Sequence, residues 1–229
     1  WRLQSKDSDY DIRFVYKRPI EDYLRLNNVP DIIEKTIENM DFVGFDILKF
    51  TKLLLSSNPS MIEWLKSDII YLDDGKTKEK FRDFIEKKYN PASLYHHYKS
   101  MCRQNYLKYL KTNENMTHKK YLYAMRGLIN AKWITKFEKM PPIDLNQTLG
   151  LIEYLPNEVI NKLKEIIELK KGELEQTKIS KIPLFDSYIE SFLKEEGSVD
   201  NRRIINYSEL QDYIFEIMGL QGGGRKIPQ

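Results

Sequence analysis

The spacing of hydrophobic and polar residues changes once along the chain, close to residue 47. Before this point, two short segments rich in Tyr, Ile, Phe and Val, at 9–16 and 42–47, have the composition and length of β-strands. After it, apolar residues recur every three or four positions, which is typical of amphipathic helices. The pattern therefore predicts an α+β fold, in which a small mixed β-sheet is followed by a predominantly α-helical region.

Capping signals mark where several helices begin. Asn58-Pro59 and Asn90-Pro91 each combine a capping Asn with Pro at the first helical position, and Thr117 is a further cap. Helices are predicted at about 47–55, 59–64, 76–88, 91–110, 118–138, 145–154, 156–176, 183–197 and 207–218. We predict three parts: a sheet-containing core at 1–88, an α-helical domain at 89–220, and a flexible basic tail at 221–229.

The first predicted strand carries two carboxylates on one face. Side chains alternate along a strand, so Asp9 and Asp11 point the same way, with Cα atoms about 7 Å apart. Adjacent like charges repel and Asp is a poor strand former, so a bound divalent cation would offset the cost. Mg²⁺ prefers one or two carboxylates together with phosphate oxygens and water. The alternative is a surface turn with a solvated acidic cluster, because Asp-Ser-Asp is also common in turns.

The second predicted strand supplies a third carboxylate, Asp46. An Asp inside an apolar run is costly unless it is paired or bound to a metal, and Gly44 on the same face leaves room for another group. If the two strands are neighbours, Asp46 can meet Asp9 and Asp11. Three clustered carboxylates suit two metal ions roughly 3.5–4 Å apart, so we expect the three side chains to converge within about 4–6 Å.

This arrangement, Asp9-x-Asp11 on one strand and Asp46 on a later one, resembles the DNA polymerase β-type nucleotidyltransferase superfamily. The wider sequence is similar to its predicted RNA-repair branch over about Ser5 to Leu145. The matching segments are Ser8-Asp9-Tyr10-Asp11-Ile12-Arg13-Phe14-Val15-Tyr16, Gly44-Phe45-Asp46-Ile47-Leu48-Lys49, Ser57-Asn58-Pro59-Ser60 with Glu63-Trp64-Leu65, Lys119-Lys120-Tyr121-Leu122-Tyr123, Arg126, Trp133 and Pro141-Pro142.

The resemblance implies a nucleotidyltransferase core. Its activity would transfer a nucleoside monophosphate from an NTP, such as ATP, to a hydroxyl acceptor, with release of pyrophosphate. Asp9, Asp11 and Asp46 would hold two Mg²⁺ or Mn²⁺ ions, and Asp46 would orient or deprotonate the attacking hydroxyl. The superfamily places a Gly-Ser pair before the Asp-x-Asp strand, where its backbone N–H groups hold the triphosphate. Because no glycine precedes Gly44, we expect the sequence to begin inside the catalytic core, which is N-terminally incomplete.

A polar stripe on the helix predicted from Thr117 is a candidate phosphate-binding surface. Lys119, Tyr123 and Arg126 recur on one helical face. In the family that the chain resembles, a helical domain closes over the triphosphate, and these side chains are suited to contact its β and γ phosphates. The alternative is the ordinary solvated face of an amphipathic helix.

Composition limits the compartment and the partners. The net charge of +3 is only mildly basic and does not by itself indicate a nucleic-acid-binding protein. Cys102 is the single cysteine, which excludes an intrachain disulfide and fits a reducing cytoplasm. Its place in a helical pattern favours a core residue over a nucleophile. No apolar run approaches the roughly 18 residues of a membrane span.

The sequence leaves the acceptor open between an RNA end, a protein hydroxyl and a small molecule, and the resemblance favours RNA. A different class of function is a catalytically inactive module of the same fold that binds RNA or a partner protein. Oligomeric state has no signal in the sequence.

Overall fold

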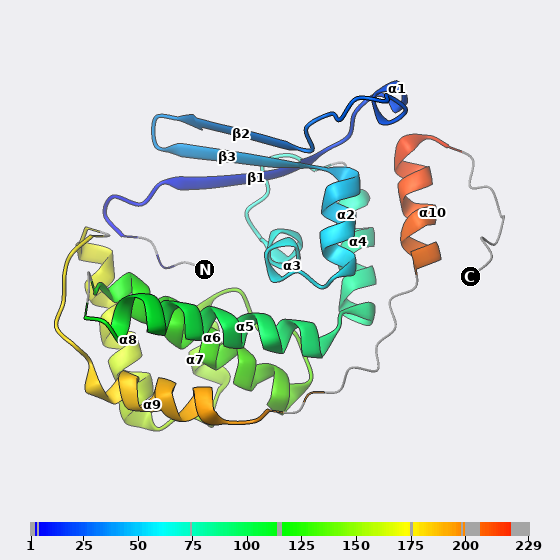
Figure 1. Ribbon diagram of the computed structural model, residues 1–229. Helices are drawn as coiled ribbons and strands as arrows, with labels where there is room; N and C mark the ends of the chain where they lie inside the picture. Colours follow the sequence, from blue (N-terminus) through cyan, green and yellow to red (C-terminus); the bar gives the residue numbers. More distant parts are fainter. Residues whose placement is uncertain are drawn as a thin grey trace. The chain divides into compact units, whose positions relative to one another are not determined.

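The computed structural model describes residues 3, 5–73, 75–113, 116–174, 176–197, 199 and 207–220 (Figure 1). The described residues form a three-stranded mixed sheet near the N-terminus followed by helices, which confirms the predicted α+β class. Contacts divide the chain into two compact units, a sheet unit of residues 9–90 and 203–229 and a helical unit of residues 1–8 and 91–202. The predicted tail at 221–229 lies outside the described residues.

The sheet has the strand order β1-β3-β2. The two predicted strands are β1 (Tyr10–Tyr16) and β3 (Met40–Asp46), and they pair in parallel as direct neighbours. Between them in sequence lies a strand that was not predicted, β2 (Ile32–Ile37), which pairs antiparallel with β3. β2 is exposed along most of its length, so it lacks the apolar run of a buried strand.

Among the described residues, five helices belong to the sheet unit. They are α1 (Ile20–Tyr23), α2 (Ile47–Leu55), α3 (Pro59–Lys66), α4 (Thr77–Lys88) and α10 (Tyr207–Met218). Asn58 caps α3 as predicted, because its side chain accepts a hydrogen bond from Ser60 N at 3.0 Å. The core of the unit is aromatic, with Phe50 stacked on Trp64 and edge-on to Phe81.

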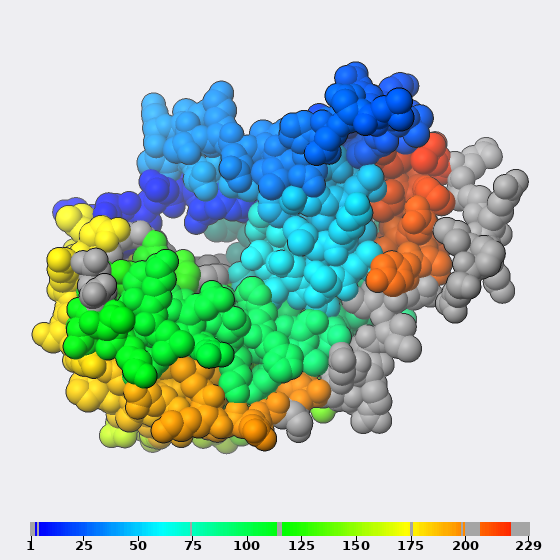
Figure 2. Space-filling model, in the orientation of Figure 1, coloured from blue at the N-terminus to red at the C-terminus, as the bar shows by residue number. Residues whose placement is uncertain are grey.

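The last helix groups with the sheet unit, although its sequence position placed it in the predicted domain at 89–220. In Figure 2, α10 (red) lies directly against the cyan helices of this unit, and it contacts α2 and α4. Glu216 forms an ion pair with Lys80, and Lys17 Nζ donates to Ile217 O at 2.7 Å. These contacts join segments far apart in the sequence, which helical periodicity alone cannot reveal.

The helical unit is built around α6 (His118–Phe137), which begins after Thr117 as predicted. Around it are α5 (Pro91–Asn105), continued by a short π-helix, η1 (Tyr106–Leu110), together with α7 (Leu145–Leu151), α8 (Asn157–Gly172) and α9 (Pro183–Lys194). Cys102 on α5 is fully buried, and burial raises the pKa of its thiol to about 12. It is therefore a core residue, as expected. Among the described residues, no helix is both long and apolar enough to cross a membrane.

The closest helix packing in this unit is between α5 and α6, and Gly127 permits it. A Cβ atom at Gly127 would lie 2.7 Å from both Tyr98 O and Cys102 N, which are backbone atoms of α5. Contacts this short cannot be relieved by a side-chain rotation. The two helices can approach only because position 127 has no side chain.

We predict that Gly127→Ala destabilises the protein by about 1–3 kcal/mol, because the added methyl group forces α5 and α6 apart. Gly150→Ala is the matched control, since Gly150 lies in α7 and a methyl group added there would have no atom within 4 Å. That change should stabilise by about 0.4–1 kcal/mol through the unfolded state. Chemical denaturation measures both. A neutral Gly127→Ala would contradict the proposed packing role.

Candidate active site

Asp9 and Asp11 lie at the start of β1. Asp9 directly precedes the strand and Asp11 is its second residue, and both side chains are exposed. The alternation of a strand puts them on the same face, as the sequence predicted. A third carboxylate that shares a site with Asp9 and Asp11 must therefore project from the same face of a neighbouring strand.

The register between β1 and β3 decides which aspartate that is. Asp11 is paired with Asp41, whereas Asp46 is paired with Tyr16. Directly paired residues share a face, so Asp41 lies beside Asp11. Asp46 is five residues further along β3, which is an odd number of steps and roughly 16 Å. Asp46 therefore lies on the opposite face, and the predicted convergence of Asp46 with Asp9 and Asp11 is wrong.

The face that carries Asp46 is filled by packing. Phe14 is paired with Gly44 across the two strands, and a Cβ atom at Gly44 would lie 2.2 Å from the Phe14 ring. The room that glycine leaves is thus taken by an aromatic ring of the neighbouring strand. Gly44 therefore leaves no space for a substrate on this face of the sheet.

Asp46 instead caps a helix. Its side chain is 4% exposed, and Oδ1 accepts a hydrogen bond from Leu48 N at 2.9 Å at the start of α2. Oδ2 accepts from Tyr23 Oη at 2.7 Å. Burial, with a further contribution from the bond to Asp46, raises the pKa of Tyr23 to about 12. The cost of an Asp in an apolar run is thus offset by a helix N-terminus and a phenol.

We predict that Asp46→Ala lowers the free energy of unfolding by about 2–3 kcal/mol, because it removes a helix cap and leaves the Tyr23 hydroxyl without its acceptor. Asp11→Ala is the matched control, and its exposed ion pair should contribute less than about 1 kcal/mol. Urea titration of both variants measures the difference. If Asp46→Ala were as stable as Asp11→Ala, the capping role would be wrong.

Arg13 joins Asp11 to Asp41. Its Nη2 atom lies 2.6 Å from Asp11 Oδ1 and 3.1 Å from Asp41 Oδ2, and Nη1 donates to Asp41 O at 2.8 Å. Arg13 thus forms an ion pair with each of the two carboxylates. Because one nitrogen contacts both carboxylates, the two oxygens lie within about 6 Å of each other. We call Asp11 and Asp41 the acidic pair.

The acidic pair has the chemistry of a site for a hard divalent cation. Both donors are carboxylates on neighbouring strands, Asp11 exposed and Asp41 partly buried, and they already share one positive charge, that of Arg13. Within the described residues, no group of three His, Cys, Asp or Glu side chains is arranged to hold a metal. The acidic pair by itself could hold a cation in place of Arg13, and Asp9 is the next carboxylate on that face.

The polar stripe of α6 lies in the helical unit. Lys119 and Tyr123 are partly buried, and Arg126 is 1% exposed. The alternative of a solvated face is therefore wrong for Arg126. The aspartates belong to the sheet unit, so the approach of this stripe to them stays a prediction.

Comparison with known proteins places the chain in a family. The family model for RlaP, described as the RNA repair pathway DNA polymerase beta family, matches residues 1–214. The chain belongs to the RlaP family. The Bacillus subtilis (strain 168) protein described as "Uncharacterized protein YcgL" is 32% identical over 192 residues, covering 83% of this chain and 73% of that protein. No solved structure matches the chain.

Membership of the RlaP family confirms the resemblance on which the sequence analysis relied. The match spans both units, so the sheet and the helices following it are parts of one family architecture. Asp41 is the candidate site residue that sequence reasoning missed. It directly precedes the predicted strand at 42–47 that contains Asp46, and the pairing register shows which of the two lies beside Asp11.

Proposed function

We propose that this RlaP-family protein is a metal-dependent nucleotidyltransferase, which transfers a nucleoside monophosphate from an NTP to a hydroxyl acceptor and releases pyrophosphate. The observation that carries the proposal is the acidic pair, two carboxylates held in register on the same face of β1 and β3 and already sharing a cation. The family description supports the reaction class and favours an RNA end as acceptor.

In this proposal Asp9, Asp11 and Asp41 hold Mg²⁺ or Mn²⁺. The bound metal would neutralise charge on the phosphates of the NTP, as in other phosphoryl transfers. Asp41 takes the place that the sequence analysis gave to Asp46, which is committed to the cap of α2. Asp41 is only partly buried, so its carboxylate can accept a hydrogen bond and the proton from an acceptor hydroxyl.

Arg13 has a positioning role in the same proposal. It holds the acidic pair together while no metal is bound, which prevents two neighbouring carboxylates from repelling each other. A metal held by the two carboxylates would take the position of the Arg13 Nη2 atom. The guanidinium would then be free to pair with a nucleotide phosphate, for which a planar cation is a suitable donor.

Lys119, Tyr123 and Arg126 form the proposed triphosphate contacts of the helical unit. They occupy one face of α6 at spacings of four and three residues, and two of them are cations. Arg126 is 1% exposed, so its part of the proposed contact requires the side chain to become accessible to the nucleotide.

A second candidate is the inactive module that binds RNA or a partner protein. The observation that favours it is the guanidinium between the two carboxylates, an arrangement that also occurs in purely structural ion pairs. Measured nucleotidyl transfer distinguishes the two candidate functions, because only the nucleotidyltransferase would turn over an NTP.

The test is incubation of the full-length protein with labelled NTP, Mg²⁺ and RNA, protein or small-molecule acceptors. Asp9→Asn, Asp11→Asn and Asp41→Asn should each abolish transfer, because each removes a metal-binding charge, and each variant should keep its fold. Asp31→Asn is the matched control, since Asp31 is exposed and pairs with Lys49. Transfer that persists in Asp41→Asn, or that requires no divalent ion, would contradict the proposal. Transfer by none of the proteins, wild type included, would favour the inactive module.

A second experiment tests the helical residues. Lys119→Gln should weaken NTP binding roughly tenfold to a hundredfold, because a charge-assisted phosphate contact contributes about 1.5–3 kcal/mol. Binding of the nucleoside without phosphates should not change. Lys136→Gln, on the same helix and with the same loss of charge, should bind NTP as wild type does. Equal losses for nucleoside and NTP would reject a phosphate contact at Lys119.

A further inference from the structure

One segment of the helical unit has a high net positive charge because acidic residues are nearly absent from it. Residues 91–137, which include α5, η1 and α6, contain nine Lys and Arg residues and one acidic residue, Glu114. The net charge of this segment is +8, whereas the whole chain carries +3, so the remaining residues carry −5. Such an asymmetry indicates a surface for a polyanion, which the charge of the whole chain conceals.

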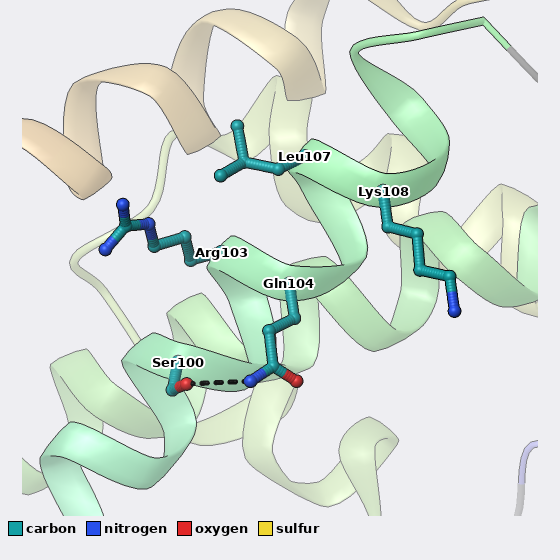
Figure 3. A pocket seen from close by; sticks show the side chains of 5 residues that line it. All are labelled: Ser100, Arg103, Gln104, Leu107 and Lys108. Atoms are coloured by element: carbon teal, nitrogen blue, oxygen red, sulfur yellow. Dashed lines mark hydrogen bonds between the residues drawn. The ribbon is translucent and has the colours of Figure 1, made fainter.

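Part of this charge lines an open hollow on α5 and η1. The hollow has a volume of about 580 Å³ and is lined by Ser100, Arg103, Gln104, Leu107 and Lys108. These positions recur at intervals of three and four residues, so they share one helical face. Arg103 and Lys108 extend on either side of Gln104, whose side chain donates to Ser100 Oγ at 3.2 Å (Figure 3). We call these five residues the basic face.

The cations of the basic face differ from those surface cations of the chain that are held in ion pairs. Lys132, Lys162 and Lys171 each form an ion pair with a glutamate. In the part of the chain that the structure describes, neither Arg103 nor Lys108 has a carboxylate within ion-pair distance. Their charge is therefore available to a ligand.

Lys120 adds a further cation at one end of the basic face, because it lies over the ring of Tyr109. Lys108 Nζ lies 5.0 Å and Lys120 Nζ 4.1 Å from the centre of the Tyr109 ring. A hydrogen bond from Lys108 lowers the pKa of the Tyr109 hydroxyl. The aromatic ring thus holds two ammonium groups near each other although they repel.

The backbone under the basic face is also unusual. Lys111 N donates to Tyr106 O at 2.9 Å, which is the five-residue spacing of a π-helix. Single π-turns within α-helices are rare and occur frequently at functional sites. Here the π-turn carries Leu107 and Lys108 of the basic face and Tyr109 next to it.

We infer that the basic face binds the phosphate backbone of single-stranded RNA. Arg103, Lys108 and Lys120 would contact phosphates, while Gln104 and Ser100 offer hydrogen bonds to sugar or base. Cationic grooves with neighbouring polar groups bind single strands through their backbone. The choice of RNA among polyanions rests on the proposed function, in which an RNA end is the acceptor, and on the RNA-repair description of the family.

Fluorescence anisotropy with a labelled single-stranded RNA 20-mer, in EDTA and without NTP, tests the inference on the full-length protein. The double variant Arg103→Gln/Lys108→Gln should bind at least about tenfold more weakly. Its plot of log K against log salt should be shallower by about 1.4, because each lost phosphate contact removes about 0.7 from the slope. Lys162→Gln/Lys171→Gln is the matched control on α8, with the same change of net charge, and should bind within about twofold of wild type.

Three outcomes would overturn the inference. They are equal losses in the two double variants, absence of RNA binding by the wild type, and equally tight binding of a poly-glutamate peptide at the same salt concentration. RNA binding at the basic face without any nucleotidyl transfer would support the surface and reject the proposed function. Transfer to RNA with an unchanged KM for RNA in Arg103→Gln/Lys108→Gln would support the function and reject the surface.

Discussion

The parallel register between β1 and β3 is the constraint on which the candidate site depends. It pairs Asp11 with Asp41 and places both side chains on one face of the sheet. A shift of one residue would turn Asp41 to the other face and separate the pair. The same register pairs Phe14 with Gly44 on the opposite face, where the ring fills the space above the glycine. The packing of Phe14 over Gly44 on one face of the sheet therefore fixes the register that brings Asp11 and Asp41 together on the other face.

Arg13 offsets the electrostatic repulsion between Asp11 and Asp41 that this register creates when no metal is bound. It does so by contacting both carboxylates and a backbone carbonyl of β3. In the proposed mechanism, a divalent cation competes with this internal cation. Binding is then weaker than it would be at a site without a counter-ion. A phosphate-bearing substrate would favour metal binding, because it gives the displaced guanidinium a new partner.

How much of this could be predicted from the sequence depends on the range of the interactions involved. Local signals were sufficient for the caps at Asn58 and Thr117 and for the alternation that puts Asp9 and Asp11 on one face. β2 was missed because an exposed edge strand carries no apolar run. Asp46 was misassigned because its burial was interpreted as a need for metal, whereas a helix N-terminus and Tyr23 satisfy it. The strand register, and the capping of α2 by a residue at the end of β3, arise only in the folded sheet. The spacing of hydrophobic residues in the sequence therefore cannot predict them.

The central claim is that Asp11 and Asp41, rather than Asp46, form the metal-binding centre. Its most direct test is an anomalous difference map from crystals of the full-length protein grown with Mn²⁺ and a non-hydrolysable NTP. The account predicts a peak within about 2–2.5 Å of carboxylate oxygens of Asp11 and Asp41, with Arg13 moved out of the space between them. A peak coordinated by Asp46, or no peak while Arg13 still joins the two carboxylates, would contradict it.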